Sequence, residues 1–244
     1  MKAMVLAAGL GTRLRPLTDT RPKALVEVGG RTLLEITLSR LRDCGVGEVM
    51  VNVHHFAEQI AGFLEARNNF GMRIELSRED DLLLDTGGGL KKAGWFFSSD
   101  TEPFIVHNVD VVSNVDVQAM LHSHQRSGAL ATLAVQERNS SRQLLFDSNF
   151  TLCGRRGPQQ EDELTGQAAP VHVLAFTGIH VISPRMAPLI KEEGVFSIID
   201  SYLRLAREGE KVVAFPADQY YWRDLGRLED LKNAEEDLKQ GFFS

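Results

Sequence analysis

Short apolar runs alternate with amphipathic segments along the first half of the chain. The runs at 2–8, 48–53, 72–77 and 103–110 are rich in apolar residues and bounded by polar ones. Strands of a sheet that is covered by helices have this length and composition. We therefore predict four buried strands in the first half.

The segments between these runs have helical periodicity. In 32–44, apolar residues recur at roughly helical spacing, and Gly45 follows where the helix would end. The other predicted helices of the first half are 56–66, 88–97 and 115–127. Strands that alternate with helices are typical of α/β proteins with a mostly parallel sheet.

The second half of the chain has a different organisation. We predict a strand at 129–136, then a hairpin over 142–154 whose turn lies at 147–149. The segment 154–169 is polar and contains glycine and proline, so we predict an exposed loop there. The remaining predicted elements are strands at 171–183, 211–217 and 219–226 and helices at 197–209 and 227–240.

Composition limits the classes of protein to consider. The 244 residues, of which 43% are hydrophobic and 25% charged, suffice for a sizeable core. The net charge of -6 disfavours a nucleic-acid partner, because binding to a phosphate backbone needs clustered positive charge. We detect no internal repeat, and therefore expect no C-terminal β-helix.

Cysteine usage and hydropathy indicate a compartment. Cys44 and Cys153 are far apart and form no CxxC pair, and the apolar start of the chain is too short for a signal peptide. No apolar run approaches the roughly 20 residues that a membrane span needs. We expect a cytoplasmic protein with no membrane partner.

The first predicted strand runs into a loop of glycines and basic residues, "AAGLGTRLRP". Gly9 and Gly11 allow the backbone to approach a ligand closely and present its amides, which predicts a phosphate-binding turn. Arg13 and Arg15 add positive charge, and Lys23 follows Pro22. The loop matches neither the P-loop pattern nor the dinucleotide fingerprint.

The stretch "LAAGLGTRLRPLTDTRPKALVEVGGRTLLE" resembles the signature of the sugar-1-phosphate nucleotidylyltransferases. The resemblance implies a three-layer α/β/α, Rossmann-like nucleotidyltransferase fold with a mixed, mostly parallel central sheet. It assigns two catalytic residues, Arg13 on the triphosphate and Lys23 at the reacting α-phosphate. The nucleotide contacts implied for the first strand and loop are Leu6, Ala7, Ala8, Gly9, Gly11, Thr12 and Arg13.

Later segments match the same family in order. "LLLDTGGGLKKA" resembles the segment that contacts the nucleobase, which assigns Thr86, Gly87 and Gly88 to the nucleotide. Three consecutive glycines are costly in a helix unless another group approaches the backbone. The whole chain, 1–244, is then one nucleotidyltransferase domain, with a nucleotide-binding half at 1–128 and a sugar-binding half at 129–244.

The resemblance also implies a magnesium site and a sugar contact. In "FIVHNVDVVSNVD", Asp110 is a metal ligand and Asn108 lies beside the nucleotide, while Val109 stands where the family typically has glycine. In "YYWRDLGRLEDL", Asp224 is the second carboxylate on Mg²⁺, an ion that prefers a few carboxylates plus phosphate oxygens. In "AFTGIHVIS", Gly178 contacts the sugar, although no E-K-P-like stretch precedes it.

The implied reaction is attack by a sugar 1-phosphate on the α-phosphorus of a nucleoside triphosphate, UTP or GTP, with release of pyrophosphate. Within the family, the chain is most similar to the N-acetylmuramate-1-phosphate uridylyltransferases. The mannose- and heptose-1-phosphate guanylyltransferases are the alternative. We expect a monomer or homodimer.

Three other interpretations are weaker. A zinc site at His54 and His55 lacks a cluster of further ligands. A glycosyltransferase would need an Asp-x-Asp motif, and the spacing of Asp110 and Asp116 does not provide one. A catalytically silent sensor of nucleotide sugars would lack Lys23 or the carboxylates, but all are present.

Overall fold

The four strands of the first half form a parallel sheet. The structure is a computed structural model that describes residues 1–140, 143–157, 159, 161–166 and 169–243. The strand order is β5-β4-β1-β6. Their bounds are β1 (Lys2–Leu6), β4 (Glu48–Val53), β5 (Arg73–Arg78) and β6 (Phe104–Asn108). Parallel strands bring their carboxyl ends, and the loops that follow them, to one edge of the sheet.

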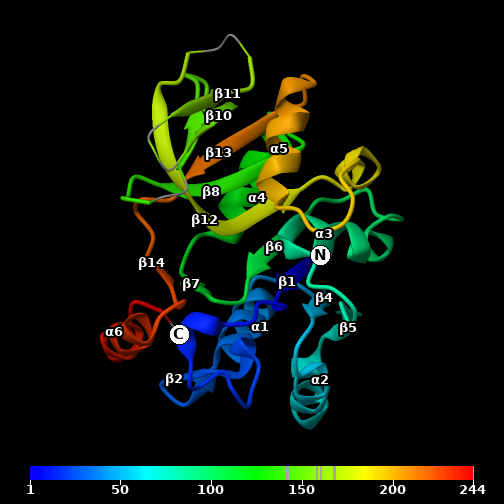
Figure 1. Cartoon of the computed structure of the whole chain (residues 1–244), viewed down its shortest axis with the longest axis vertical. Helices are drawn as coiled ribbons and strands as arrows, with labels where there is room; N and C mark the ends of the chain where they lie inside the picture. Colours follow the sequence, from blue (N-terminus) through cyan, green and yellow to red (C-terminus); the bar gives the residue numbers. More distant parts are fainter. Residues whose placement is uncertain (141–142, 158, 160, 167–168, 244) are drawn as a thin grey trace.

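The second half extends this sheet with antiparallel strands (Figure 1). Strand β12 (His172–Ile182) pairs antiparallel with β6, and then with both β8 and β9. The other strands of the extension are β8 (Ala131–Gln136), β9 (Gln143–Phe146), β10 (Leu152–Arg156), β11 (Asp162–Leu164) and β13 (Val212–Pro216). Strand β13 is parallel to β8.

Two short ribbons lie outside the main sheet. Strands β2 (Glu27–Val28) and β3 (Arg31–Thr32) pair with each other. Strand β7 (Val111–Ser113) pairs antiparallel with β14 (Trp222–Asp224). In Figure 1, β14 leads from the second half of the chain down to α6 beside the first half. This return brings Asp224 to the segment that follows β6.

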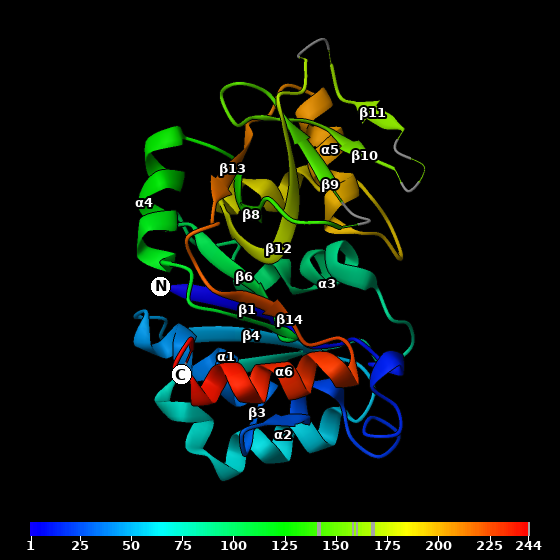
Figure 2. The same ribbon diagram turned by 90° about the vertical axis from the view of Figure 1, so that its left-hand side faces the viewer.

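Helices cover both faces of the sheet, and side chains that alternate along each strand enter two cores. Ala3 and Val5 of β1 enter one core, and Met4 enters the other. Helices α1, α2, α4 and α6 pack on the first face, and α3 and α5 on the second (Figure 2). The bounds are α1 (Leu33–Asp43), α2 (Ala57–Ala66), α3 (Asp85–Ala93), α4 (Val117–Ser127), α5 (Ile198–Arg207) and α6 (Leu228–Lys239).

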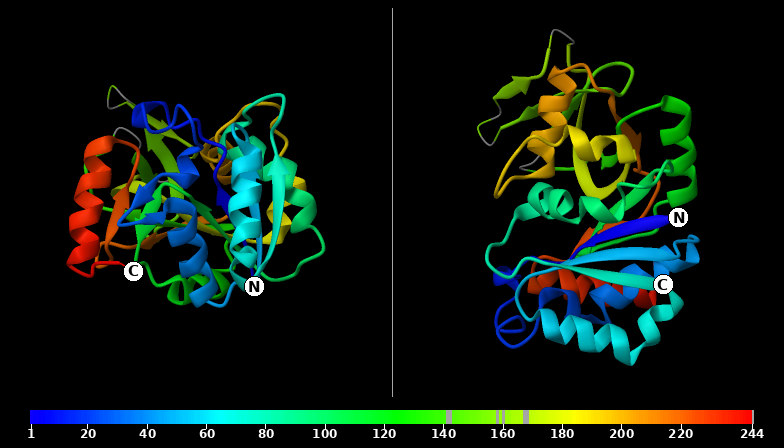
Figure 3. Two further views of the ribbon diagram at one scale, coloured as in Figure 1. Left: turned by 90° about the horizontal axis from the view of Figure 1, so that it is seen from below. Right: turned by 90° about the vertical axis from the view of Figure 1, so that its right-hand side faces the viewer.

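The layered α/β/α prediction is confirmed, with helices on both sides of a mixed sheet. Viewed from below in Figure 3, α1, α2 and α6 lie across one face. Among the described residues, no helix is both long and apolar enough to span a bilayer.

Most predicted elements are present, and two are misplaced. The hairpin is confirmed, since β9 and β10 pair antiparallel. The prediction of a loop over 154–169 is wrong in part, because β10 continues to Arg156 and pairs with β11. Residues 158, 160, 167 and 168 lie outside the described residues. The helix predicted at 88–97 begins earlier, at Asp85, and ends at Ala93.

Candidate active site

The glycine-rich loop follows β1 at the carboxyl edge of the sheet. The amide of Ala7 donates to Asn52 Oδ1 at 2.7 Å, so this amide is already bonded within the protein. Among the described groups, none accepts a hydrogen bond from the amides of Gly9, Leu10 or Gly11. A side chain added at Gly9 would meet no atom within 4 Å. The turn at 9–11 therefore has both the open space and the free donors that a phosphate requires.

Lys23 is held against this turn. Gly11 has a φ of +64°, and a Cβ there would lie 3.0 Å from the Lys23 Cβ. The residue is 7% exposed, and its ammonium forms an ion pair with Asp110, which follows β6. The structure thus brings the predicted lysine and one predicted metal ligand into contact, from segments 87 residues apart.

Asp224 lies in the same charged cluster. Burial and the Asp110 carboxylate raise the pKa of Asp224, while Lys23 and Arg13 act in the opposite direction. A Cβ on Gly226 would lie 2.7 Å from Asp224 Oδ1 and 3.0 Å from an Arg13 guanidinium nitrogen. The glycine two residues after the carboxylate therefore leaves room for the arginine beside it. The other arginine of the loop, Arg15, is paired with Asp19 at 3.3 Å on the surface.

The two carboxylates fit a small divalent cation. Asp110 and Asp224 repel each other, and a bound cation would remove that repulsion. Among the described residues, no third acidic, histidine or cysteine side chain completes a metal cluster. Two carboxylates leave the other coordination positions of the ion to phosphate oxygens and water, which is the arrangement that magnesium prefers.

The three glycines of α3 are packed against the protein's own chain. A Cβ on Gly87 would lie 2.4 Å from the Phe196 ring, and one on Gly88 would lie 2.6 Å from the Gly194 carbonyl oxygen. The Gly87 amide donates to the Phe196 carbonyl at 3.0 Å. Thr86 Oγ1 accepts from the Ile198 amide at 3.0 Å. The close approach that the sequence predicted is made here by residues 194–198 at Gly87 and Gly88, and by the Asn52 and Glu79 side chains at Gly89.

A buried carboxylate joins this segment to the phosphate turn. Glu79 is 1% exposed and accepts from Asn52 Nδ2 at 2.7 Å and from the Leu84 amide at 2.8 Å. Since Asn52 also holds the Ala7 amide, the three groups connect the loop after β1 to the start of α3. Sequence analysis missed this connection, although both residues are polar and lie at the ends of predicted buried strands.

The predicted sugar contact lies next to the predicted nucleotide contact. Gly178 has a φ of +83°, and a Cβ there would lie 2.7 Å from Asn108 Nδ2. Val109 is 4% exposed in the core, and its amide donates to the Leu6 carbonyl at 3.1 Å. The valine that replaces the usual glycine therefore points into the core.

Helix α6 fixes the strand that carries Asp224. Asp237 Oδ2 accepts from the Tyr221 hydroxyl at 2.6 Å and from Arg223 Nε at 2.7 Å. Phe242 and Phe243 pack against the Tyr221 ring. These contacts hold β14 against α6 and the end of the chain, and sequence analysis did not identify them.

Comparisons with known proteins identify the family of the chain. The family model described as nucleotidyl transferase matches residues 2–143. The chain is 35% identical to an N-acetylmuramate alpha-1-phosphate uridylyltransferase of Caulobacter vibrioides, across 92% of this chain and 91% of that protein. It is 30% identical to a UTP–glucose-1-phosphate uridylyltransferase of Synechocystis sp., across 94% of this chain but only 61% of that protein.

Solved structures share the fold. The crystal structure of a UDP-glucose pyrophosphorylase complexed with UDP-glucose superposes with a TM-score of 0.79 and covers 98% of each chain. Its sequence is 16% identical, so this similarity supports the architecture alone.

Proposed function

Because the chain belongs to the nucleotidyl transferase family and is a sugar-1-phosphate nucleotidyltransferase, we propose that it makes a UDP-activated acidic sugar. The substrates are UTP and N-acetylmuramate 1-phosphate, and the products are UDP-N-acetylmuramate and pyrophosphate. The observation that supports this choice is the similarity to an N-acetylmuramate alpha-1-phosphate uridylyltransferase, which extends over more than nine tenths of both chains. In this proposal the protein acts in the cytoplasm as a monomer or homodimer.

The two halves of the chain have separate roles in this proposal. Residues 1–128 bind the nucleotide through Leu6, Ala7, Ala8, Gly9, Gly11, Thr12, Arg13, Thr86, Gly87, Gly88 and Asn108. Residues 129–244 build the sugar pocket, in which Gly178 lies against the sugar. Contact between a nucleobase and the α3 glycines requires that the base lie beside, or displace, residues 194–198.

The reaction is a displacement at phosphorus. A phosphate oxygen of the sugar 1-phosphate attacks the α-phosphorus of UTP, the bond from that phosphorus to the bridging oxygen breaks, and pyrophosphate leaves with the electron pair. The amides of the 9–11 turn and Arg13 hold the triphosphate oxygens. Lys23, released from Asp110, stabilises the charge that develops at the α-phosphate.

Asp110 and Asp224 would hold magnesium in this proposal. When bound, the ion neutralises phosphate charge and orients the two anionic reactants. The positive groups of the chain then complete the neutralisation, since Lys23 and Arg13 both lie in the electrostatic environment of Asp224.

The test is to identify the product. The protein is incubated with magnesium, all five common nucleoside triphosphates and a mixture of sugar 1-phosphates, and the nucleotide sugars are identified by mass spectrometry. UDP-N-acetylmuramate as the main product supports the proposal. GDP-mannose or a GDP-heptose as the main product would replace it with the guanylyltransferase alternative.

A further inference from the structure

Arg138 occupies an unusual position two residues after the end of β8. Its guanidinium carbon lies 3.9 Å from the centre of the Trp222 ring, a cation–π contact. One terminal nitrogen donates to the Phe176 carbonyl at 2.9 Å. The side chain is therefore held in one place by an aromatic face and a backbone oxygen, before any ligand binds.

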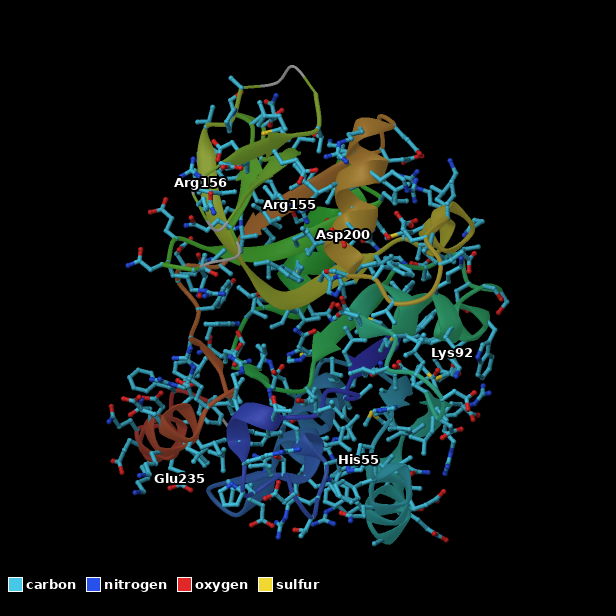
Figure 4. All side chains as sticks on the ribbon, viewed as in Figure 1. His55, Lys92, Arg155, Arg156, Asp200 and Glu235 are labelled. Carbon is cyan, nitrogen blue, oxygen red and sulfur yellow. The ribbon has the colours of Figure 1, made fainter. Side chains whose placement is uncertain are left out.

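This cation has no carboxylate partner among the described residues. No described carboxylate lies within 4 Å of its nitrogens, and its Nε is buried without a hydrogen-bond partner. In contrast, Arg155 is paired with Asp200 at 2.8 Å (Figure 4). Arg156 is paired with Asp162 at 2.8 Å. Unsatisfied buried donors are rare in folded proteins, so the position of this side chain calls for an explanation.

A polar groove opens beside this guanidinium. It has a volume of about 410 Å³ and is lined, among the described residues, by Glu137, Arg138, Asn139, Gln143 and Val173. We call it the Arg138 groove. Its volume is within the range of small-molecule sites, and its amide and carboxylate groups match sugar hydroxyls and amides.

The Arg138 groove lies next to the proposed reaction centre. Trp222 and Asp224 are two residues apart on β14, so their side chains share one face of the strand, about 7 Å apart. The Asp224 charge also raises the pKa of Arg138, opposing the larger effect of burial. A sugar whose phosphate lies at Asp224 can therefore extend its ring toward Arg138.

We propose that Arg138 selects an acidic sugar: its guanidinium binds a carboxylate on the sugar ring of the sugar 1-phosphate. A planar guanidinium binds a carboxylate with two parallel hydrogen bonds. N-acetylmuramate carries such a group as a lactyl ether, and N-acetylglucosamine does not. This inference rests on the proposed function and adds the residue that binds the carboxylate of the sugar.

The test removes the negative charge of the substrate and the positive charge of the protein in turn. Wild-type protein and Arg138→Gln are each given N-acetylmuramate 1-phosphate and its lactyl methyl ester, with UTP, and kcat/KM is measured. We expect wild type to prefer the acid by about 10- to 100-fold and Arg138→Gln to show no preference. Arg138→Lys, which keeps the charge without the fork, should fall between them.

Arg126→Gln is the matched control, because Arg126 is exposed on α4 and has no carboxylate partner among the described residues. It should retain the wild-type preference for the acid. If Arg138→Gln does not fold, the binding of UDP-N-acetylmuramate and UDP-N-acetylglucosamine to wild type and Arg138→Lys is compared by calorimetry. We expect wild type to bind UDP-N-acetylmuramate more tightly than UDP-N-acetylglucosamine, and Arg138→Lys to show a smaller difference. The same difference in both proteins, or none in wild type, would contradict the proposal.

The remaining outcomes separate the two proposals. Arg138→Gln lowering kcat/KM equally for acid and ester means that Arg138 binds the phosphate or only supports Trp222, and overturns this inference. Equal use of acid and ester by wild type also overturns it, while product formation leaves the proposed function standing. Wild type that forms no product from N-acetylmuramate 1-phosphate, but does from another sugar 1-phosphate, overturns both.

Discussion

Lys23 and Asp110 form an ion pair that joins the loop after β1 to the segment after β6. The pair places the lysine ammonium on a carboxylate that would hold the metal, beside Asp224 and Arg13. Binding of a cation and a triphosphate would exchange these partners, so that Lys23 becomes free to contact phosphate. The contact gives a lysine that is 7% exposed an oppositely charged partner within the protein.

Replacing this lysine tests its role in catalysis. We expect Lys23→Ala to lower kcat about 1,000-fold, because the charge that develops at the α-phosphate loses a positioned cation. Pyrophosphate release measures the loss, and circular dichroism checks that the fold is kept. Lys232→Ala, on the exposed face of α6, is the control and should retain full activity. A fully active Lys23→Ala variant would remove the lysine from the mechanism.

The Asp224 carboxylate should cost the free protein stability. Burial and Asp110 raise its pKa, so the folded protein holds the Asp224 proton more tightly than the unfolded chain does. The gain in stability from this tighter proton binding is thus present at low pH, and it is lost as pH rises through the raised pKa. At pH 7 we expect Asp224→Asn to raise the melting temperature by about 2 °C. This shift corresponds to a gain of at most about 1 kcal/mol in the free energy of unfolding, because solvent screens the charges.

Thermal denaturation of wild type and Asp224→Asn across pH 4 to 8, without metal, measures this difference. The two melting temperatures should converge at acidic pH, where the wild-type carboxyl group is protonated. A variant that melts below wild type at pH 7 would show that Asp224 stabilises the free protein instead.

The same carboxylate should control magnesium binding. We expect Asp224→Asn to need at least about 10-fold more magnesium for half-maximal activity, because one of two charged ligands is lost. Wild-type affinity should also fall as pH decreases through the raised pKa of Asp224. The magnesium dependence of the initial rate measures the first effect, and calorimetric titration with magnesium in the presence of a nucleotide measures the second. An identical magnesium dependence for the variant would exclude Asp224 from the site.

Alanine substitutions at two glycines should have different effects, one on the KM for UTP and the other on stability. Gly9 has open space around it, so Gly9→Ala should change the free energy of unfolding by less than about 0.5 kcal/mol but raise the KM for UTP. A Cβ at Gly88 would meet the Gly194 carbonyl oxygen, so Gly88→Ala should lose about 1–3 kcal/mol of stability. Urea unfolding and initial rates separate the two. Unchanged UTP binding in Gly9→Ala would contradict the phosphate turn.

Asn52 should support the nucleotide site without touching the substrate. Asn52→Ala leaves the Ala7 amide and Glu79 Oε1 without this partner, at a cost of about 1–3 kcal/mol. We expect a higher KM for UTP, because the loop after β1 loses its support. Urea unfolding and UTP titration test this, and a variant with wild-type stability would show that water replaces the amide.

Local sequence patterns predicted the fold well where packing is regular. Strand β4 has the predicted bounds, 48–53, because buried apolar residues end at polar ones. The 154–169 segment was mispredicted in part, because its charged residues are typical of an exposed loop. In the structure, Arg155 and Glu163 form an ion pair across β10 and β11. Strand pairing through exposed ion pairs has no hydrophobic pattern.

The sequence also predicted which charged residues lie near one another, while their roles stay predictions. The residues of recognisable motifs, Lys23, Asp110 and Asp224, lie together, because the loop after β1 brings Lys23 to Asp110 and the pairing of β14 with β7 brings Asp224 beside them. Glu79 and Asp237 were missed, because each acts through a contact with a residue far away in the sequence. Sequence periodicity contains no information on such pairs.

The most direct measurement is the initial rate of pyrophosphate release from UTP and N-acetylmuramate 1-phosphate, with magnesium and with a chelator. The account predicts one pyrophosphate for each UDP-N-acetylmuramate formed, and loss of both products when the metal is chelated. Binding of the nucleotide sugar with no pyrophosphate release from any pair of substrates would contradict it and identify a sensor.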